Sequence, residues 1–545
     1  MKVTSWFKAL LVLMVFFIAS CGQKNTVGNK KVFRLNYSSG ALEAIDPAFA
    51  KDIYQIWTCH MVYNTLVETD SNLNITPSLA KSWDVSPDGL HFIFHLRGDV
   101  FFHDNEVFPS GKGRRMTAGD IVYSFSRVIN PKVASPGAWI FNSHVDSSKP
   151  FEAINDTTFQ LNLKHNFRPI LQLLGVAYCN IVAKEVVEKW GKDYRSHPCG
   201  TGPFSFNYWD EGNNLALVKN NHYWEKDAQG KQLPYLDGVQ ISFIDSKASE
   251  FMMLRQGRID FMNNIDGSFK DLIFDKNGNL KPDFKGKLKV EKNTYLNTEY
   301  IGFNTDTTNE LVKNSPIKDR LVRQAINYAI DREKIVLFFK NNMCIPATHG
   351  FIPKGIQGYK PSADYGYKYN QAKAAELLQQ AGYPKGKGLK PITFQVPDNL
   401  VDIVNYITTD LKAVGIPAKI ETIQPNILKQ QMSAGKVPVF RGNWMADYPD
   451  AETFLVVFLG SQPAPPNYTR FKNELYDRWY DAAISLPDSA RYEMYAKMDS
   501  LAMSYAPLIP LYYDMRIHFL QNNITGFKSN AMNVISLKEA DINGQ

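Results

Sequence analysis

The sequence predicts an α/β protein built from at least two lobes, and three observations support this fold class. The chain has 545 residues, which exceeds the size at which a single hydrophobic core stops growing. Its first part alternates apolar and polar residues in short segments, as β-strands do. After about residue 298 the pattern becomes an alternation of strands and helices. With 44% hydrophobic and 13% aromatic residues, the composition is typical of a globular protein.

The first part contains five segments that place bulky apolar side chains on one face of a strand. Phe33, Leu35 and Tyr37 are spaced by two residues, so their side chains share a face. Each such segment is expected to bury that face against a core. The same spacing recurs at Phe92, Phe94 and Leu96, at Phe159, Leu161 and Leu163, at Leu215 and Leu217, and at Val239, Ile241 and Phe243.

The second part contains three helical segments whose ends are marked by particular residues. Ser315 and Pro316 predict a helix start, because Ser caps free backbone N–H groups and Pro needs none at the first position. Asn370 predicts a second helix start and Gly382 its end. A third helix is expected to end at Gly415. Strand-like runs follow the second and third helices, at 392–397 and 418–423.

The N-terminus predicts export and a lipid anchor. A basic start is followed by ten apolar residues (9–18), which is too short for a mature membrane span but fits a signal peptide. Small residues precede Cys21, as in the lipobox of bacterial lipoproteins. We therefore expect a signal peptide over 1–20 and a lipidated tether over 21–31, with lipid on Cys21. The alternative is an ordinary signal peptide with a chance cysteine.

The charge of the chain gives no indication of a nucleic-acid partner. The formal net charge is +7, and removal of Lys2 and Lys8 with the signal peptide would subtract two from it. No basic stripe runs along the sequence. The densest basic cluster, 111–115, is flanked by loop-forming residues, which favours a solvated loop over a phosphate-binding patch.

Motifs for catalysis or metal binding are weak or missing. The GTGPF stretch (200–204) lacks a third glycine, and Pro203 removes a backbone N–H that a phosphate cradle would use. His91, His95 and His103 have no carboxylate at matching spacing to complete a metal site. The sequence contains no GxSxG and no GxxxxGK[ST] motif. We therefore expect no enzymatic activity, no bound metal and no cofactor.

Besides Cys21, the sequence has four cysteines, at 59, 179, 199 and 344. They have no zinc-site spacing. Cys179 and Cys199 flank one helix-like segment, so a disulfide between them is plausible in an exported protein. Free buried thiols are the alternative.

Several stretches, taken in order, resemble one protein family. The most distinctive block is ITPSLAKSWDVSPDGLHFIFHLRGDVFFHDNEVF (75–108), followed by MTAGDIVYSFSRVINP (116–131). Together the stretches resemble the oligopeptide-, dipeptide- and nickel-binding class of extracellular solute-binding lipoproteins, which deliver ligands to ABC importers. The other matching stretches are AIDPAFA (44–50), GTGPFSFNYWDEGNNLALVKNNHYW (200–224), VRQAINYAIDREKIV (322–336), PATHGFIP (346–353), YNQAKAAELLQQAGYP (369–384), WMADYPDAETFL (444–455) and RYEMYAKMDSLAMSYAPLIPLYY (491–513).

The resemblance implies a two-lobed periplasmic-binding-protein-like fold with a hinge. Two crossing segments would join the lobes, and the first lobe would carry an extra subdomain. By similarity, the first lobe comprises 32–70, 201–297 and 514–545, the extra subdomain 71–200, and the second lobe 298–513.

The resemblance also implies a ligand site around GNWMADYPD (442–450). In peptide-binding relatives, the Asp of a W-x-x-D motif pairs with the peptide's α-ammonium group, and here that residue is Asp447. Arg441 matches an Arg that can approach a ligand carboxylate. Trp444 and Tyr448 are expected to contact the ligand beside it. For Asp447 the alternative is a loop-capping carboxylate, and for Trp444 it is a core position.

The implied function is that of a membrane-anchored protein that captures peptides and delivers them to an ABC import permease and its ATPase subunits. It would act as a monomer in the cell envelope, facing the periplasm or the cell exterior. Two departures leave the ligand open, because a Trp that relatives carry is missing from 421–430 and a His is missing near 396–405. The alternatives are a nickel chelate, a sugar or a haem-like ligand on the same fold, or an exported hydrolase.

Overall fold

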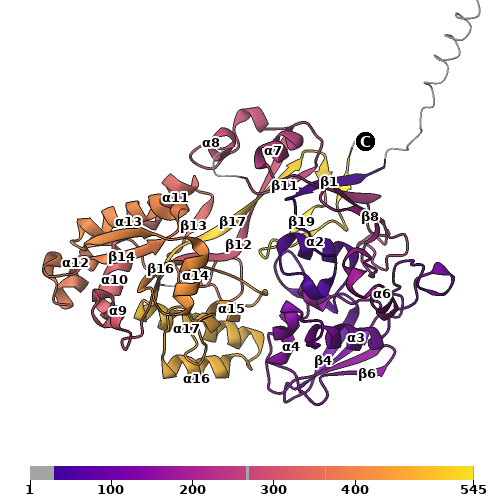
Figure 1. Cartoon of the computed structure of the whole chain (residues 1–545), viewed down its shortest axis with the longest axis horizontal. Coiled ribbons are helices and arrows are strands. Elements are labelled where there is room, and N and C mark those ends of the chain that lie inside the picture. Colours follow the sequence, from indigo (N-terminus) through magenta and orange to yellow (C-terminus); the bar gives the residue numbers. More distant parts are fainter. Residues whose placement is uncertain (1–29, 266–268, 363, 544–545) are drawn as a thin grey trace, which may run out of the picture.

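A computed structural model describes residues 30–265, 269–362 and 364–543, which form two lobes (Figure 1). The predicted two-lobed α/β architecture is confirmed. The names first lobe, extra subdomain and second lobe are kept for the predicted ranges, whose boundaries stay predictions. The chain runs through the first lobe and extra subdomain, then the second lobe, and its C-terminal segment returns to the first lobe (Figure 1).

The first lobe is built on a four-stranded sheet of order β1-β10-β9-β8. β1 (Val32–Tyr37) pairs in parallel with β10 (Gly238–Phe243), which joins β9 (Asn214–Lys219) and β8 (Phe204–Asp210). The alternating apolar residues of β1 are fully buried, as expected for a strand with one face on a core. This pairing brings the start of the mature chain beside residues some two hundred positions later.

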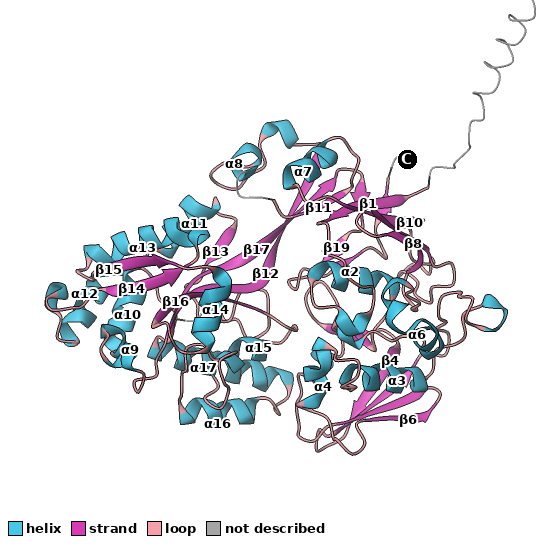
Figure 2. Ribbon diagram, in the orientation of Figure 1, coloured by secondary structure: helices cyan, strands magenta, loops and turns pink. Residues whose placement is uncertain are grey.

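The extra subdomain has a separate antiparallel sheet of order β4-β5-β7-β6 (Figure 2). Its strands are β4 (Ala80–Val85), β5 (His91–Leu96), β6 (Phe151–Asn155) and β7 (Thr158–Asn162). Helix α3 (Ala118–Ile129) covers β6 and β7. The Phe125 ring of α3 meets Phe151 and Phe159 edge-on at 5.5 and 5.7 Å, which fixes the helix on the sheet.

Two long antiparallel strands, β12 (Leu288–Phe303) and β17 (Leu508–Gln521), pass between the lobes (Figure 1). At one end β17 pairs with the short β11 (Phe261–Asn263); at the other, β12 pairs with β16 (Val439–Met445). The pairing of β12 with β17 is interrupted between Thr294 and Thr298. A bulge of this kind bends and twists a strand, so the chain changes direction where the lobes meet.

The second lobe continues the β12–β16 sheet with β14 (Ile392–Val396) and β15 (Ala418–Thr422). These two strands pair in parallel, and helix α13 (Val401–Ala413) connects them. The strand predictions at 392–397 and 418–423 are therefore confirmed. Asn370 caps α12 (Gln371–Gln380), as predicted, by accepting a hydrogen bond from the Lys373 backbone.

The helix predicted to begin at Ser315 begins later. Ser315 caps only a 3₁₀ turn over Pro316–Lys318, and Asp319 then caps α10 (Arg320–Ala329). Asp331 caps a further helix, α11 (Arg332–Lys340). Each Asp accepts a backbone hydrogen bond at the start of its own helix, so three capping side chains divide the segment.

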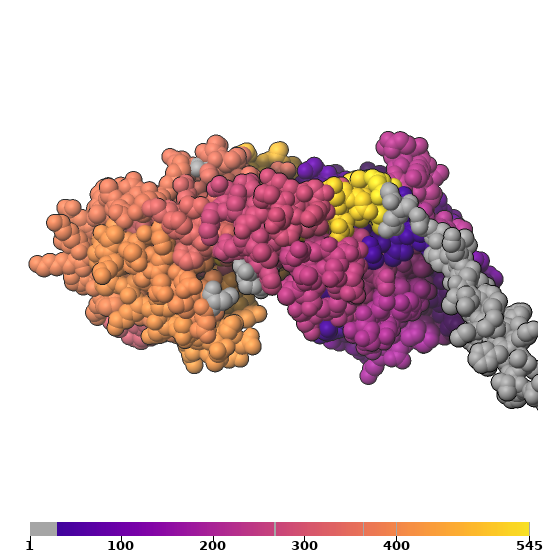
Figure 3. Space-filling model, turned by 90° about the horizontal axis from the view of Figure 1, so that it is seen from above, coloured from indigo at the N-terminus to yellow at the C-terminus, as the bar shows by residue number. Residues whose placement is uncertain are grey.

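The extra subdomain also touches the second lobe away from β12 and β17. The Arg168 backbone N–H donates to the Ile484 carbonyl at 3.0 Å. The rings of Trp139 and Tyr448 lie 6.2 Å apart. The lobes are thus also in contact outside the crossing strands, here and where the Asn341 side chain donates to Asp271 at 2.8 Å. Viewed from above, an indentation separates the lobes, and the segment that carries α7 (Lys247–Arg255) lies over their junction (Figure 3).

The predicted signal peptide, Cys21 and most of the predicted tether lie outside the described residues. Within the described ranges, no helix is both long and apolar enough to cross a membrane.

All four cysteines of the described chain are free thiols. Cys59, Cys179 and Cys199 are buried, and Cys344 is partly buried. The disulfide considered between Cys179 and Cys199 is therefore not formed; the alternative of free buried thiols holds.

Candidate ligand-binding site

A cavity of about 460 Å³ lies where the first lobe, the extra subdomain and the second lobe meet. Helix α2 (Ile53–Val62) and the hairpin of β2 (Val67–Thr69) and β3 (Ile75–Pro77) form part of its lining. The C-terminal segment 528–539 forms another part. The second lobe contributes Asp447 and Pro449. The cavity therefore has walls from both lobes, which is the arrangement that a ligand enclosed by lobe closure requires.

Asp447 reaches this cavity because β16 ends beside the crossing strands. The register of β16 with β12 sets Trp444 opposite Thr298, and the Ala446 N–H donates to the Leu296 carbonyl at 2.8 Å. The next residue is Asp447, whose backbone N–H donates to the Thr453 hydroxyl at 3.3 Å. The loop is thus held at both ends, and the carboxylate is presented to the cavity.

The Asp447 carboxylate has no cationic partner among the described residues. Its side chain is reached by solvent from the cavity but is crowded by protein atoms. This partial loss of water raises its pKa to about 6, although a hydrogen bond with Thr453 opposes the shift. A carboxylate whose charge is neither fully hydrated nor paired is stabilised by a ligand that brings a positive charge.

The charge of Asp447 contributes to the pKa shifts of neighbouring residues. Burial raises the pKa of Tyr178 to about 12, and the charge of Asp447 contributes to the shift. Tyr178 belongs to the extra subdomain, so Asp447 lies near that subdomain. Burial also raises the pKa of Glu452 to about 7, again with a contribution from Asp447. Glu452 accepts hydrogen bonds from the hydroxyls of Tyr448 and Tyr480.

Of the four predicted ligand residues, Asp447 alone lines the cavity. Trp444 is half-buried, and its indole N–H donates to the Thr453 carbonyl at 2.6 Å, which braces the Asp447 loop. Tyr448 is buried, with its hydroxyl on Glu452 and its ring near Trp139. Neither residue is among those that line the cavity. Their roles in ligand binding stay predictions.

Arg441 already has a partner. Its guanidinium Nη2 lies 2.6 Å from Glu299 Oε2, and Nη1 donates to the Asn443 side chain at 3.1 Å. Burial raises the pKa of Glu299, while the charge of Arg441 opposes this shift. Arg441 thus neutralises a buried carboxylate of the crossing strand β12, and its predicted contact with a ligand stays a prediction.

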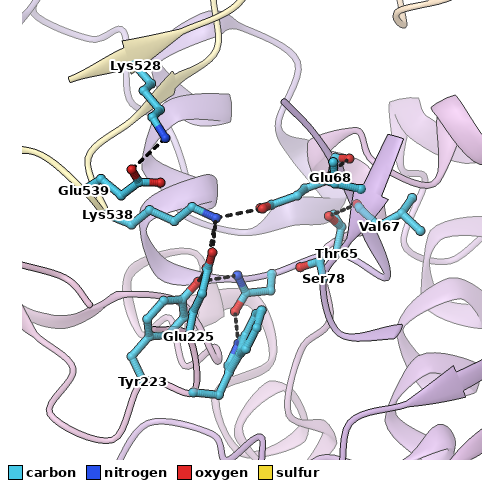
Figure 4. Close-up of polar contacts among 12 residues, drawn as sticks. Thr65, Val67, Glu68, Ser78, Tyr223, Glu225, Lys528, Lys538 and Glu539 are labelled. Atoms are coloured by element: carbon cyan, nitrogen blue, oxygen red, sulfur yellow. Dashed lines mark hydrogen bonds and ion pairs between the residues drawn. The ribbon is translucent and has the colours of Figure 1, made fainter. Parts of the chain in front are cut away.

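Three charged residues of the cavity come from distant parts of the chain and were not predicted from sequence. The Lys538 ammonium lies 2.7 Å from Glu68 Oε1 and 2.8 and 2.9 Å from the two oxygens of Glu225 (Figure 4). The Tyr223 hydroxyl donates to Glu225 Oε2 at 2.9 Å. No sequence motif links these residues, because the fold alone brings them together.

The three histidines that the sequence offers as metal ligands each contact a different residue. His91 contacts the Asn162 side chain, His95 contacts Asp84, and His103 contacts the Gly202 carbonyl. Among the residues that the structure describes, no group of three or more metal-binding side chains comes together.

Comparison with protein families gives one family match. The sequence model described as "Bacterial extracellular solute-binding proteins, family 5 Middle" matches residues 74–466. Heme-binding protein A of Haemophilus influenzae is 28% identical over 485 residues, covering 86% of this chain and 84% of that protein. The glutathione-binding protein GsiB of Salmonella paratyphi A is 26% identical over 511 residues, covering 91% and 92% respectively.

Solved structures share the fold. The periplasmic murein tripeptide-binding protein MppA, in its unliganded open form, superposes with a TM-score of 0.81 at 22% identity, covering 94% of this chain and 98% of that one. The periplasmic binding protein DppA of Helicobacter pylori, in complex with the peptide STSA, gives a TM-score of 0.71 at 26% identity, with the same coverage. The resemblance found in the sequence is thus confirmed: the chain belongs to family 5 of the bacterial extracellular solute-binding proteins, the binding proteins of ABC importers.

Proposed function

We propose that this protein captures peptides at the cell envelope and delivers them to the permease of an ABC importer. One observation carries the choice of ligand. Asp447 is a carboxylate without a cationic partner among the described residues, and the second lobe presents it to a cavity formed largely by the first lobe and the extra subdomain. A ligand with an ammonium group would give this carboxylate its missing counter-ion.

A peptide α-ammonium suits this position for a simple reason. Its pKa of about 8 keeps it protonated at neutral pH. Closing two lobes around it strips its water, so an opposite charge must replace that hydration. The Asp447 carboxylate can do so, and the ion pair in turn returns the pKa of Asp447 toward its ordinary value. The pair would therefore form best when the lobes are closed.

Closure is part of the proposal. The bulge between Thr294 and Thr298 gives the crossing strands a point at which they can bend. The similarity to an unliganded open form is consistent with an arrangement that precedes closure. Movement of the second lobe toward the first would enclose a ligand whose ammonium group lies at Asp447.

The rest of the proposal concerns the membrane anchor, the partner subunits and the oligomeric state. A lipid on Cys21 would hold the protein on a membrane, and the tether would let the two lobes reach a permease. Binding without catalysis is proposed, and ATP hydrolysis would belong to the partner subunits. The protein would work as a monomer.

Calorimetry with a tripeptide and its N-acetylated form tests the ligand class. We expect Ala-Ala-Ala to bind and N-acetyl-Ala-Ala-Ala to bind at least about 30-fold more weakly, because acetylation removes the charge that meets Asp447. Equal binding of the two peptides, or binding of neither, would refute the proposal. Native mass spectrometry of the freshly purified protein adds an independent measurement, since an enclosed ligand should co-purify.

A haem-like ligand is the second candidate. A heme-binding relative is 28% identical, and His60 lines the cavity. Burial lowers the pKa of His60 to about 4, so its imidazole is neutral and able to bind a metal at physiological pH. Titration with haemin, followed by its Soret absorbance, tests this candidate. A shifted Soret band that His60→Ala abolishes would support it, and an unchanged spectrum would exclude it.

A further inference from the structure

The charges that line the cavity do not balance. The lining contains the carboxylates of Glu68, Asp70, Glu225, Asp447 and Glu539, but only two lysines, Lys528 and Lys538. Both lysines already have carboxylate partners within the cavity wall. The lining therefore offers a ligand several negative charges and no free lysine.

Lys538 is fully engaged. An ammonium group has three N–H donors, and Lys538 makes three contacts, one with Glu68 and two with Glu225. Its side chain is only 14% exposed. Lys528 lies 2.6 Å from Glu539, in a separate pair (Figure 4). Lys538 cannot meet a ligand carboxylate unless an existing ion pair breaks, and the charge of Lys528 is already balanced by Glu539.

The two carboxylates beside Lys538 differ in whether one of their oxygens remains free to accept a hydrogen bond from a ligand. Glu225 uses both oxygens, because Lys538 contacts each of them and the Tyr223 hydroxyl donates to Oε2. Glu68 contacts Lys538 through Oε1 only, and its Oε2 has no hydrogen-bond partner within the described parts of the chain. The Glu68 side chain is 35% exposed and lines the cavity. Oε2 is therefore the acceptor that a ligand can reach.

The electrostatics of Glu68 point the same way. Burial raises its pKa, the charge of Lys538 opposes the shift, and the neighbouring charge of Glu225 adds to it. One lysine thus serves two carboxylates, and the cluster carries one negative charge in excess when both are ionised. A second cation beside Glu68 would remove this excess, whereas a ligand carboxylate would increase it.

We infer that Glu68 determines specificity, so that the cavity selects ligands with a second cationic group and rejects those with an additional carboxylate. This inference rests on the proposed function, in which the first cationic group is the α-ammonium at Asp447. The preferred ligands are then peptides with a lysine or arginine side chain. Acidic peptides are disfavoured, because both lining lysines are already paired.

Lys538 acts indirectly. It lies in the C-terminal segment, while Glu68 is in β2 and Glu225 follows β9. Its contacts join the three segments. Because Lys538 binds Oε1 of Glu68, the other oxygen, Oε2, remains available to a ligand. Lys538 is therefore a positioning residue, and Glu68 is the residue that meets the ligand.

Calorimetry with matched tripeptides tests the inference. Each set replaces one alanine of Ala-Ala-Ala with Lys, Gln or Glu, at the first, second or third position. We expect the wild type to bind a Lys peptide about tenfold more tightly than the matching Gln peptide for at least one position, and the Glu peptide most weakly. This magnitude is between that of an exposed and that of an enclosed ion pair.

Three variants separate specificity from folding. Glu68→Gln should reduce the Lys-to-Gln preference, measured as the ratio of the two affinities within the variant, to about threefold or less. Glu68→Asp keeps the charge and should keep much of the preference. Glu188→Gln is the matched control, because Glu188 is exposed on the extra subdomain and does not line the cavity; it should behave as wild type.

The outcomes distinguish this inference from the proposed function. Peptides that bind without charge preference, or a full Lys preference retained by Glu68→Gln, overturn the inference and leave the peptide receptor intact. If no peptide binds, including Ala-Ala-Ala, the proposed function fails and the inference with it. A Lys preference lost in Glu68→Gln and retained in Glu188→Gln supports it.

Discussion

Arg441 and Glu299 form an ion pair on two adjacent strands, with Nη2 2.6 Å from Oε2. Glu299 lies on the crossing strand β12. Arg441 lies on β16, the strand of the second lobe that pairs with β12. Their side chains are 27% and 9% exposed, respectively. The arginine that sequence similarity assigns to the ligand therefore also neutralises a carboxylate at the base of the second lobe.

This pair predicts a loss of stability when Arg441 is removed. Arg441→Met should lower the free energy of unfolding by roughly 2–4 kcal/mol, because it leaves Glu299 buried without a counter-ion; the partial exposure of Arg441 keeps the cost below that of a fully buried pair. Urea titration measures it. The double variant Arg441→Met, Glu299→Leu is the control and should recover most of the loss. The predicted ligand contact is tested by a C-terminally amidated peptide, which should lose affinity in the wild type but not in Arg441→Met if Arg441 meets the carboxylate.

Asp447 and a peptide ammonium should be energetically coupled. Asp447→Asn keeps the shape of the side chain and removes its charge, which should weaken binding of Ala-Ala-Ala by roughly 2–5 kcal/mol. That is about 30-fold to several thousand-fold in affinity. N-acetylation should matter much less in the variant, because the pair is already broken. Asp156→Asn, an exposed position on the extra subdomain, serves as the control. Two strictly additive losses would mean that Asp447 does not touch the amine.

Binding should weaken on acidification through the pKa of Asp447. Desolvation raises this pKa to about 6, so the free protein carries a charged Asp447 at pH 7 and a mostly neutral one at pH 5. A neutral carboxyl cannot pair with the ammonium, and affinity should fall about tenfold between these pH values. Calorimetry at several pH values measures this. Asp447→Asn should show a much flatter profile. Glu452, whose pKa burial raises to about 7, is present in both proteins, so it does not confound the comparison.

Anchoring depends on Cys21. Cys21→Ser should abolish incorporation of a fatty-acid analogue and release the protein from membranes, because serine provides no thiol for lipidation. Metabolic labelling followed by membrane fractionation measures both effects. Cys344→Ser is the matched control and should be labelled and retained as the wild type is. Normal labelling of Cys21→Ser would contradict the prediction.

Ligand binding should make the molecule more compact. If the lobes close around a peptide, small-angle scattering should give a smaller radius of gyration with saturating Ala-Ala-Ala than without it. N-acetyl-Ala-Ala-Ala, at a concentration that leaves the site empty, should give no change. An unchanged radius across a titration in which calorimetry records binding would argue against closure.

Much of the fold was predictable because its signals are local. The two-residue spacing of Phe33, Leu35 and Tyr37 and the cap at Asn370 each depend on a few neighbouring residues, and both predictions are confirmed. The start of α10 was predicted four residues early. Ser315 has the right chemistry for a cap, but Asp319 stands closer to the long helix and caps it instead.

Only the part of the site that lies within a recognisable sequence motif was predictable. Asp447 was found through its W-x-x-D context, and it does line the cavity. The same stretch could not reveal that Trp444 turns to the Thr453 carbonyl or that Arg441 is held by Glu299, because both partners are fixed by tertiary structure. Glu68, Glu225 and Lys538 meet from three separate segments, so no local pattern indicated their contact.

The contact between the extra subdomain and the second lobe limits how the lobes can move. The backbone bond from Arg168 to Ile484 and the meeting of Trp139 with Tyr448 lie apart from the bend in β12 and β17. Two bodies that touch at two separate places, and keep both contacts, can only turn about the line that joins those places. Such a motion rotates one wall of the cavity relative to the other about a fixed axis. Asp447, next to Tyr448, then lies close to that axis and travels little, while more distant parts of the second lobe sweep through larger arcs.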